Sequence, residues 1–196
     1  MNIDELMAQE SNFRAGFVAI LGKPNAGKST LVNSLLGEKL VAVSGLPQTT
    51  RDRINAIYSD ETMQAIFVDT PGLVEATDKL NESLRYNVLE ALEGVDVVLH
   101  MLDVTEKEPM GEDMAEIVAA LGTPRLLVVN KLDKVGAGFD LDTWLEEQAE
   151  PFDRTWYEEI IGMSATTGTG RERLLEAVRE LLPPGPPLYD PEQLTD

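Results

Sequence analysis

The chain has 196 residues, 43% of them hydrophobic, which is enough for one globular domain with a substantial core. Its 35 acidic and 16 basic side chains give a net charge of −19, which repels polyanions and argues against non-specific nucleic-acid binding. The absence of cysteine excludes disulfides, thiolate metal sites and cysteine nucleophiles, and no apolar run is long enough to span a membrane.

Apolar runs typical of strands buried on both faces alternate with helical patterns. This alternation predicts an α/β fold, a mostly parallel six-stranded sheet with helices on both faces. The strand-like runs lie at residues 16–21, 54–58, 65–68, 95–102, 126–129 and 160–163. Apolar residues at helical spacing predict helices around residues 80–92, 114–121 and 174–182. Ligands of such folds bind at the carboxyl ends of the strands.

The chain divides into a leader, one domain and a linker. Residues 1–13 lack the cationic start of a secretory signal, so we interpret them as a loose leader and expect a cytoplasmic protein. Residues 14–182 form the predicted domain. The proline-rich tract at 183–187 ends the last helix and predicts a stiff extended linker over residues 183–196.

A phosphate-binding loop is predicted at residues 22–29, directly after the first apolar run. The residues Gly-Lys-Pro-Asn-Ala-Gly-Lys-Ser match the pattern G-x-x-x-x-G-K-[ST] between a strand and a helix, whereas a merely connecting glycine-rich turn is the alternative. The glycines let backbone N–H groups turn towards a β-phosphate, the lysine can reach the β- and γ-phosphates, and the serine hydroxyl can bind Mg²⁺. The expected nucleotide contacts are Gly22, Asn25, Ala26, Gly27, Lys28, Ser29 and Thr30.

Two further loops carry residues suited to the metal and the γ-phosphate. Thr50, which we favour over Thr49, can bind Mg²⁺ through its hydroxyl and the γ-phosphate through its backbone, so its loop would act as a switch. Asp69 follows the run 65–68 and can hold Mg²⁺ through a water molecule. Gly72 can bring its N–H close to the γ-phosphate. The predicted metal set is therefore Ser29, Thr50 and Asp69.

Residues 130–133, Asn-Lys-Leu-Asp, follow the fifth strand-like run and predict selection of guanine. The Asp133 carboxylate can accept both the N1–H and the exocyclic NH₂ of guanine, a pair that adenine does not offer. Asn130 can tie this loop to the phosphate loop, and the stem of Lys131 can lie over the base plane. At Ser164 and Ala165, after the last strand-like run, a backbone N–H can donate to guanine O6.

These motifs follow the order of the five boxes of GTPases, and the chain resembles the Era family of the TrmE–Era–EngA group. The run Pro-Gln-Thr-Thr-Arg at 47–51 and the tail Pro-Gly-Pro-Pro-Leu-Tyr at 184–189 look most like Era, and the similarity covers residues 13–196. The resemblance implies a Ras-like P-loop GTPase domain that binds GTP and GDP with Mg²⁺, hydrolyses GTP and acts in assembly of the small ribosomal subunit.

The resemblance also implies partners beyond the nucleotide. In the Era family a C-terminal KH domain binds 16S rRNA, but no KH-type Gly-x-x-Gly follows the linker here. We therefore expect rRNA and the small ribosomal subunit to be partners of the parent protein, and this chain alone to bind RNA weakly. Peripheral association with the inner membrane is a further implication of the resemblance.

Catalysis must differ from that of Ras-like enzymes, which place a water-orienting glutamine where this chain has Leu73. In relatives with asparagine at the fourth position of the phosphate loop, that residue is similar to a potassium ligand. The resemblance thus implies K⁺ at Asn25 and the catalytic set Asn25, Lys28, Thr50 and Gly72. Two alternatives stay open: a non-hydrolysing nucleotide-gated binding module, and a related GTPase of tRNA modification or ribosome assembly. The single histidine, His100, is expected in the core rather than in catalysis.

Overall fold

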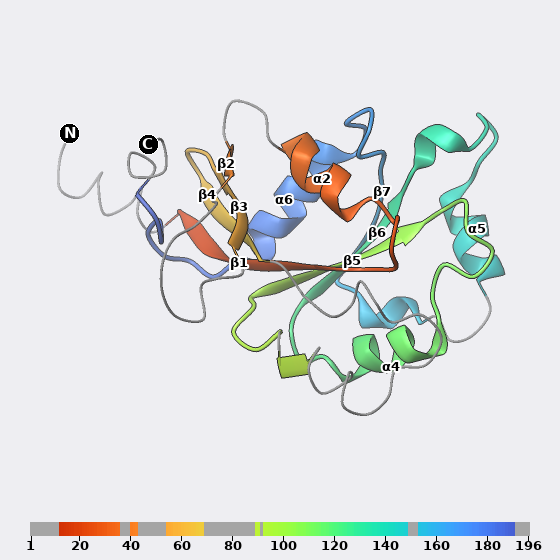
Figure 1. The fold of residues 1–196 in the computed structure, drawn as a ribbon, viewed down its shortest axis with the longest axis horizontal. Coiled ribbons are helices and arrows are strands. Elements are labelled where there is room, and N and C mark those ends of the chain that lie inside the picture. The colour runs from red at the N-terminus through yellow and green to blue at the C-terminus, as the bar shows by residue number, and fades with distance from the viewer. Residues whose placement is uncertain are drawn as a thin grey trace.

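The computed structural model describes residues 12–35, 40–42, 54–68, 89–90, 92–148 and 153–190 (Figure 1). The elements in chain order are β1 (Arg14–Leu21), α2 (Lys28–Leu35), β2 (Leu40–Ala42), β3 (Ile54–Ser59), β4 (Met63–Val68), β5 (Val97–Asp103), α4 (Glu112–Ala120), β6 (Arg125–Asn130), α5 (Leu141–Glu147), β7 (Glu159–Gly162) and α6 (Arg171–Leu181). Short 3-10 turns lie at Leu132–Lys134 and Arg154–Trp156.

One sheet of seven strands has the order β2-β3-β4-β1-β5-β6-β7. All pairs from β4 to β7 are parallel, and only β2–β3 and β3–β4 are antiparallel. The predicted mostly parallel α/β sheet is confirmed, and the six predicted runs correspond to β1 and β3 to β7. The seventh strand, β2, spans three residues at the edge, too short for a hydrophobic period to reveal it.

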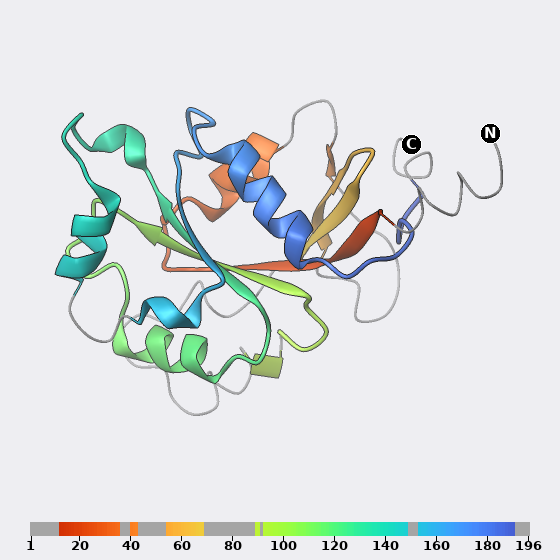
Figure 2. The same ribbon diagram turned by 180° about the vertical axis from the view of Figure 1, so that it is seen from behind.

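Two apolar layers cover the sheet, because alternate side chains of each strand face opposite sides. In β5 every residue is buried: Val97, Leu99 and Met101 join one core cluster, while Val98 and Leu102 join the other. Figures 1 and 2 show α2 and α6 over the first face and α4 over the second. This burial explains why the central strands are continuous apolar runs rather than alternating ones.

Two of the three predicted helices lie within the described residues, as α4 and α6. Of the predicted 80–92 helix, residues 80–88 lie outside the described residues, residues 89–90 are helical, and Leu92 is buried in the turn that follows. The sequence missed α5, whose start is capped by Asp140 accepting from the Thr143 N–H. No helix of the described part of the chain combines the length and apolar character needed to cross a membrane.

The tail expected as a linker is hydrogen-bonded to the sheet as far as Tyr189. Ala15 N–H donates to Pro183 O at 3.2 Å. Further along, the fully buried amide of Gln64 in β4 accepts from the N–H groups of Leu188 and Tyr189, and it donates to Tyr189 O, each at 2.8 Å. Residues 183–190 therefore form part of the folded domain, whereas 191–196 lie outside the described residues.

Candidate nucleotide-binding site

The loops that the sequence singled out follow β1, β6 and β7, which run parallel in the same sheet. Their carboxyl ends therefore meet at one edge, where doubly wound folds bind ligands. Three loops are brought together there, at residues 22–27, 130–134 and 164–169. The loop that follows β5 lies at the same edge.

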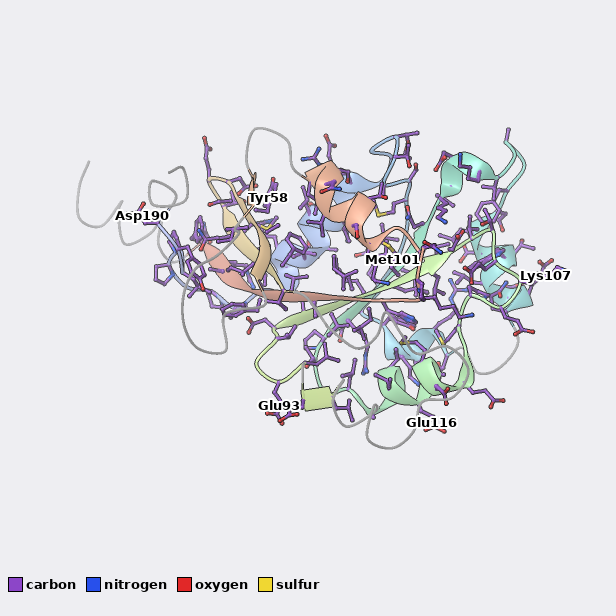
Figure 3. All side chains as sticks on the ribbon, in the orientation of Figure 1. Tyr58, Glu93, Met101, Lys107, Glu116 and Asp190 are labelled. Atoms are coloured by element: carbon purple, nitrogen blue, oxygen red, sulfur yellow. The ribbon has the colours of Figure 1, made fainter. Side chains whose placement is uncertain are left out.

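Two glycines let the phosphate loop curl against the strands beside it. Gly22 has φ +148° and Gly27 has φ +104°, a region that favours glycine. A Cβ on Gly22 would clash with the carbonyl of Met101, and a Cβ on Gly27 would clash with the amide nitrogen of Asn130. Met101 is labelled in Figure 3 beside this loop. The glycines of the motif are thus required by the packing of the loop as well as by its curvature.

The Lys28 ammonium folds back onto the backbone of the loop. Its Nζ donates to the carbonyl of Gly22 at 2.6 Å and to that of Lys23 at 2.8 Å. Leu31 N–H donates to Gly27 O at 2.8 Å, which starts α2 directly behind the loop. The side chains of Ser29 and Thr30 are exposed at that helix start, and Asn25 is exposed at the loop tip with φ +64°. These groups fit a polyphosphate and a hydroxyl-ligated Mg²⁺.

Asn130 connects three loops through one buried amide. Its Nδ2 donates to Ala26 O at 2.8 Å, and its Oδ1 accepts from the Ala165 N–H at 2.9 Å. The side chain is buried, so both bonds are shielded from water. Asn130 makes the tie to the phosphate loop that the sequence indicated, and adds a second tie to the loop after β7.

Asp133 is held as an ionised acceptor. Ser164 Oγ donates to its Oδ1 at 2.7 Å, and Lys134 Nζ lies 3.5 Å from its Oδ2. The hydrogen bond from Ser164, with Lys134 beside it, holds the pKa of the Asp133 carboxyl below its usual value. A carboxylate oriented in this way suits a ligand that presents two adjacent N–H groups.

The backbone of Ser164 and Ala165 is engaged differently from the expectation. Ser164 N–H donates to Thr169 O at 3.0 Å, and Ala165 N–H donates to Asn130. Both candidate donors for guanine O6 therefore have protein acceptors in this structure. What Ser164 presents to the base loop is its hydroxyl, a role that the sequence reasoning did not assign.

Sequence reasoning also missed Asp103, the last residue of β5. Its Oδ2 lies 2.5 Å from Lys131 Nζ, so the lysine expected over a base plane is anchored to a buried acid. Lys131 has φ +70°, which directs the chain away from β6 into the turn that carries Asp133. The sequence pattern that could have identified Asp103 as a site residue is an acid directly after a buried strand, the same pattern from which Asp69 was predicted.

Thr50, Asp69, Gly72 and Leu73 lie outside the described residues, so the structure tests neither the predicted switch loop nor two of the three predicted metal ligands. Within the residues that are described, no group of three acidic or histidine side chains is arranged to hold a metal ion.

His100 lies within β5 and is almost fully buried. Its Nδ1 is 2.7 Å from Tyr157 Oη, and its ring stacks on that of Tyr157, while its Nε2 has no hydrogen-bond partner among the described residues. Burial lowers the pKa of His100 to about 3, so it stays neutral. The histidine belongs to the core, as expected.

Comparisons with known proteins agree with this geometry. A family model described as 50S ribosome-binding GTPase matches residues 17–131. GTPase Era of Trichlorobacter lovleyi is 44% identical over 189 residues, which cover 95% of this chain and 62% of that protein. The chain thus spans about 62% of the length of the curated relatives it matches.

Two solved structures are similar at 34% identity. A single-residue variant of Aquifex aeolicus Era bound to GDP·AlF₄⁻ has a TM-score of 0.70 and matches 94% of this chain and 62% of its own. Era in complex with MgGDPNP and nucleotides 1506–1542 of 16S ribosomal RNA has a TM-score of 0.68 and matches 91% of this chain and 60% of its own. With the phosphate loop, the Asn130 link and the Asp133 acceptor in place, the chain belongs to the 50S ribosome-binding GTPase family of P-loop proteins, and it is similar to the GTPase Era proteins.

Proposed function

We propose that this chain is the guanine-nucleotide-binding and GTP-hydrolysing part of an Era-type GTPase. The observation that carries the proposal is the double hydrogen bond of Asn130, because one buried amide joins the phosphate loop to both loops of the predicted base site. A connecting turn would have no need of such a link. The similarity to solved Era structures holding GDP·AlF₄⁻ and MgGDPNP supports the same ligand.

The described residues would divide the nucleotide between them. The Lys28 ammonium would exchange its two carbonyl acceptors for phosphate oxygens, which are stronger, charged acceptors. Asp133, held by Ser164, would accept from the guanine N1–H and NH₂. An adenine in that position would leave the carboxylate unpaired, which costs several powers of ten in selectivity.

Ser29, Thr50 and Asp69 would hold Mg²⁺, which neutralises charge on the β- and γ-phosphates. Thr50 and Gly72 would contact the γ-phosphate and so report the nucleotide state. Because Leu73 cannot orient water, we further propose that the exposed Asn25 at the loop tip helps to bind K⁺ beside the phosphates. The nearby positive charge would stabilise the transition state of phosphoryl transfer.

For the whole protein we propose a role in assembly of the small ribosomal subunit. The solved Era complex contains 16S rRNA, whereas the matching family model is described by the 50S ribosome. We favour the small subunit because the Era proteins match 95% of this chain and the family model matches only residues 17–131. A cytoplasmic location stays a prediction from the sequence, and a peripheral association with the inner membrane stays a prediction from the resemblance.

Two measurements test the nucleotide proposal. GDP should bind at least about 100-fold more tightly than ADP, since the base site rejects adenine through an unpaired carboxylate. Lys28→Ala should abolish Mg²⁺-dependent GTP binding, while Arg173→Ala, which removes a positive charge from the exposed face of α6, should leave it unchanged. GDP and ADP affinities within threefold of each other, or normal binding by Lys28→Ala, would refute the assignment.

Single-turnover cleavage of GTP by the purified chain separates the GTPase from a non-hydrolysing module. We expect Mg²⁺-dependent release of phosphate. Tight binding of GTP without any release over hours would instead favour the binding module.

A further inference from the structure

Asp103 occupies a position between the two halves of the nucleotide site. It ends β5 and pairs in register with Asn130 at the end of β6. Its side chain is 6% exposed, with Oδ2 on Lys131 Nζ at 2.5 Å. Its other oxygen, Oδ1, accepts from Thr105 N–H at 2.9 Å and from Thr105 Oγ1 at 2.7 Å. Both oxygens of the carboxylate are therefore committed to fixed partners.

These bonds keep the carboxylate of Asp103 ionised and hold the ammonium of Lys131 in one position. Burial alone would raise the pKa of the Asp103 carboxyl, but the bonds from Lys131 and Thr105 outweigh it and hold that pKa below its usual value. Lys131 is fixed at its other end by its left-handed backbone between β6 and the following turn. A lysine normally retains considerable rotamer freedom, so this ion pair removes disorder before any ligand arrives.

The loop that Asp103 begins also reaches the phosphate loop. Lys23 Nζ lies 3.7 Å from Glu106 Oε2 and donates to the carbonyl of Glu108. Val104 N–H donates to Asn130 O at 3.1 Å. Lys107, labelled in Figure 3, marks this loop, which we name the 103–108 loop. The loop thus contacts the phosphate loop on one side and the base loop on the other.

We propose that Asp103 is a positioning residue for the guanine base, acting through the ammonium of Lys131. The inference rests on the proposed nucleotide-binding function. With Nζ held at Asp103 and the backbone held in the turn that carries Asp133, the four-carbon stem of Lys131 is fixed at both ends and needs less ordering to cover a base. Because the ammonium of Lys131 is paired with the charge of Asp103, it can be partly buried at the site without the cost of burying an unpaired charge.

A matched turn elsewhere in the chain separates positioning from local stability. Asp153 accepts from Thr155 N–H at 2.8 Å and from Thr155 Oγ1 at 2.7 Å, the same local bonds that Asp103 makes to Thr105. Asp153 is exposed and lies outside the nucleotide site. Asp153→Asn therefore controls for the turn, and Asp103→Asn, which keeps the acceptor for Thr105, removes the charge that holds Lys131.

The test measures GDP affinity and thermal unfolding of the wild type, Asp103→Asn, Lys131→Met, their double variant and Asp153→Asn. We expect Asp103→Asn to weaken GDP binding about 3- to 10-fold, the loss that corresponds to ordering one long side chain on binding. The double variant should bind no more weakly than Lys131→Met alone, because Asp103 acts only through the ammonium. Asp153→Asn should bind GDP as the wild type does.

Several outcomes overturn the inference. If Asp103→Asn melts at a lower temperature but binds GDP normally, Asp103 has a structural role only. If the losses of GDP affinity in the two single variants add up in the double variant, Asp103 does not act through Lys131. If Asp103→Asn does not fold, Thr105→Val, which removes the hydroxyl bond to Oδ1, carries the test: about twofold weaker binding supports positioning, and unchanged binding opposes it. A wild type that fails to bind GDP at all would refute the proposed function together with this inference.

Discussion

Ser164 Oγ donates a 2.7 Å hydrogen bond to Asp133 Oδ1, which joins two residues that lie 31 positions apart in the chain. The bond orients the carboxylate and lowers its pKa, so Asp133 is a preset acceptor at the neutral pH where a nucleotide would bind. Ser164 is itself buried, and its hydroxyl also accepts from the Thr167 N–H at 3.2 Å. The orientation of Asp133 therefore depends on the loop after β7 as well as on its own turn.

Asp133→Asn should exchange the base preference of the site. Xanthine carries a carbonyl where guanine has NH₂, so an amide in place of the carboxylate can donate to it. We expect GDP binding to fall by orders of magnitude and xanthosine diphosphate binding to rise, as measured by calorimetric titration of both nucleotides. Ser164→Ala should weaken GDP binding only several-fold and keep guanine preferred, because the carboxylate remains but loses its orientation. Equal preference for both bases in the wild type would contradict the assignment.

Gly27→Ala should disrupt the site, whereas Gly122→Ala should not. The new Cβ would meet the amide nitrogen of Asn130, and alanine is strained at φ +104°. We expect a loss of about 1–3 kcal/mol in the free energy of unfolding, measured by denaturant titration. GDP binding should also be strongly impaired. Gly122→Ala is the control, since a Cβ there meets nothing within 4 Å. Equal stability of the two variants would show that the link between Gly27 and Asn130 is not strained by a side chain.

GTP hydrolysis should be faster in K⁺ than in Na⁺. The chain has Leu73 where a water-orienting glutamine would stand, so a cation beside the phosphates would supply the missing charge stabilisation. Asn25→Ala should remove the difference between the two salts while GDP still binds. The measurement is the rate of phosphate release in K⁺ and in Na⁺ at matched ionic strength. Identical rates for the wild type in the two salts would count against K⁺ at this site.

The stability of the domain should decrease as the pH falls from 7.5 to 5.5 because of His100. Its folded-state pKa of about 3 lies below the ordinary value of 6.5. Between these two pH values His100 is therefore protonated in the unfolded chain and neutral in the folded one. The stability contributed by the neutral histidine is present above pH 6.5 and is lost as the pH falls below it, by about 1.4 kcal/mol at pH 5.5. His100 is the single histidine of the sequence, and most carboxyl groups titrate below this window. Urea unfolding at both pH values should show the difference in the wild type and not in His100→Phe.

This chain alone should bind RNA weakly. Its net charge of −19 opposes the phosphate contacts that supply most non-specific affinity, and it spans 60% of the solved Era chain that holds 16S rRNA. We expect a Kd no tighter than about 10⁻⁶ M for a single-stranded RNA of the 16S 3′ end at physiological salt. Filter binding that instead gave sub-micromolar, sequence-dependent affinity would place an RNA site on this domain.

The strand–helix alternation, the parallel sheet and the loops that could hold a nucleotide were readable from the sequence, because each depends on a local pattern. A buried parallel strand needs a continuous apolar run, and a phosphate loop needs glycines at fixed positions, here Gly22 and Gly27. The same locality explains the misses. Strand β2 is three residues long, and α5 depends on the side chain of Asp140 rather than on a long apolar stripe.

The connections across the site were decided by the tertiary structure. The pairs Asp103–Lys131 and Asn130–Ala26 are separated by 28 and 104 residues, and they meet because parallel strands end at one edge of the sheet. The tail shows the same dependence: its prolines predicted an extended linker, yet the buried amide of Gln64, 125 residues before Tyr189, binds it to β4. The sequence alone determined which chemical groups the chain could offer to a nucleotide. Only the packed sheet, by burying Asp103, Asn130 and Gln64 away from water, decided which distant partners must satisfy them.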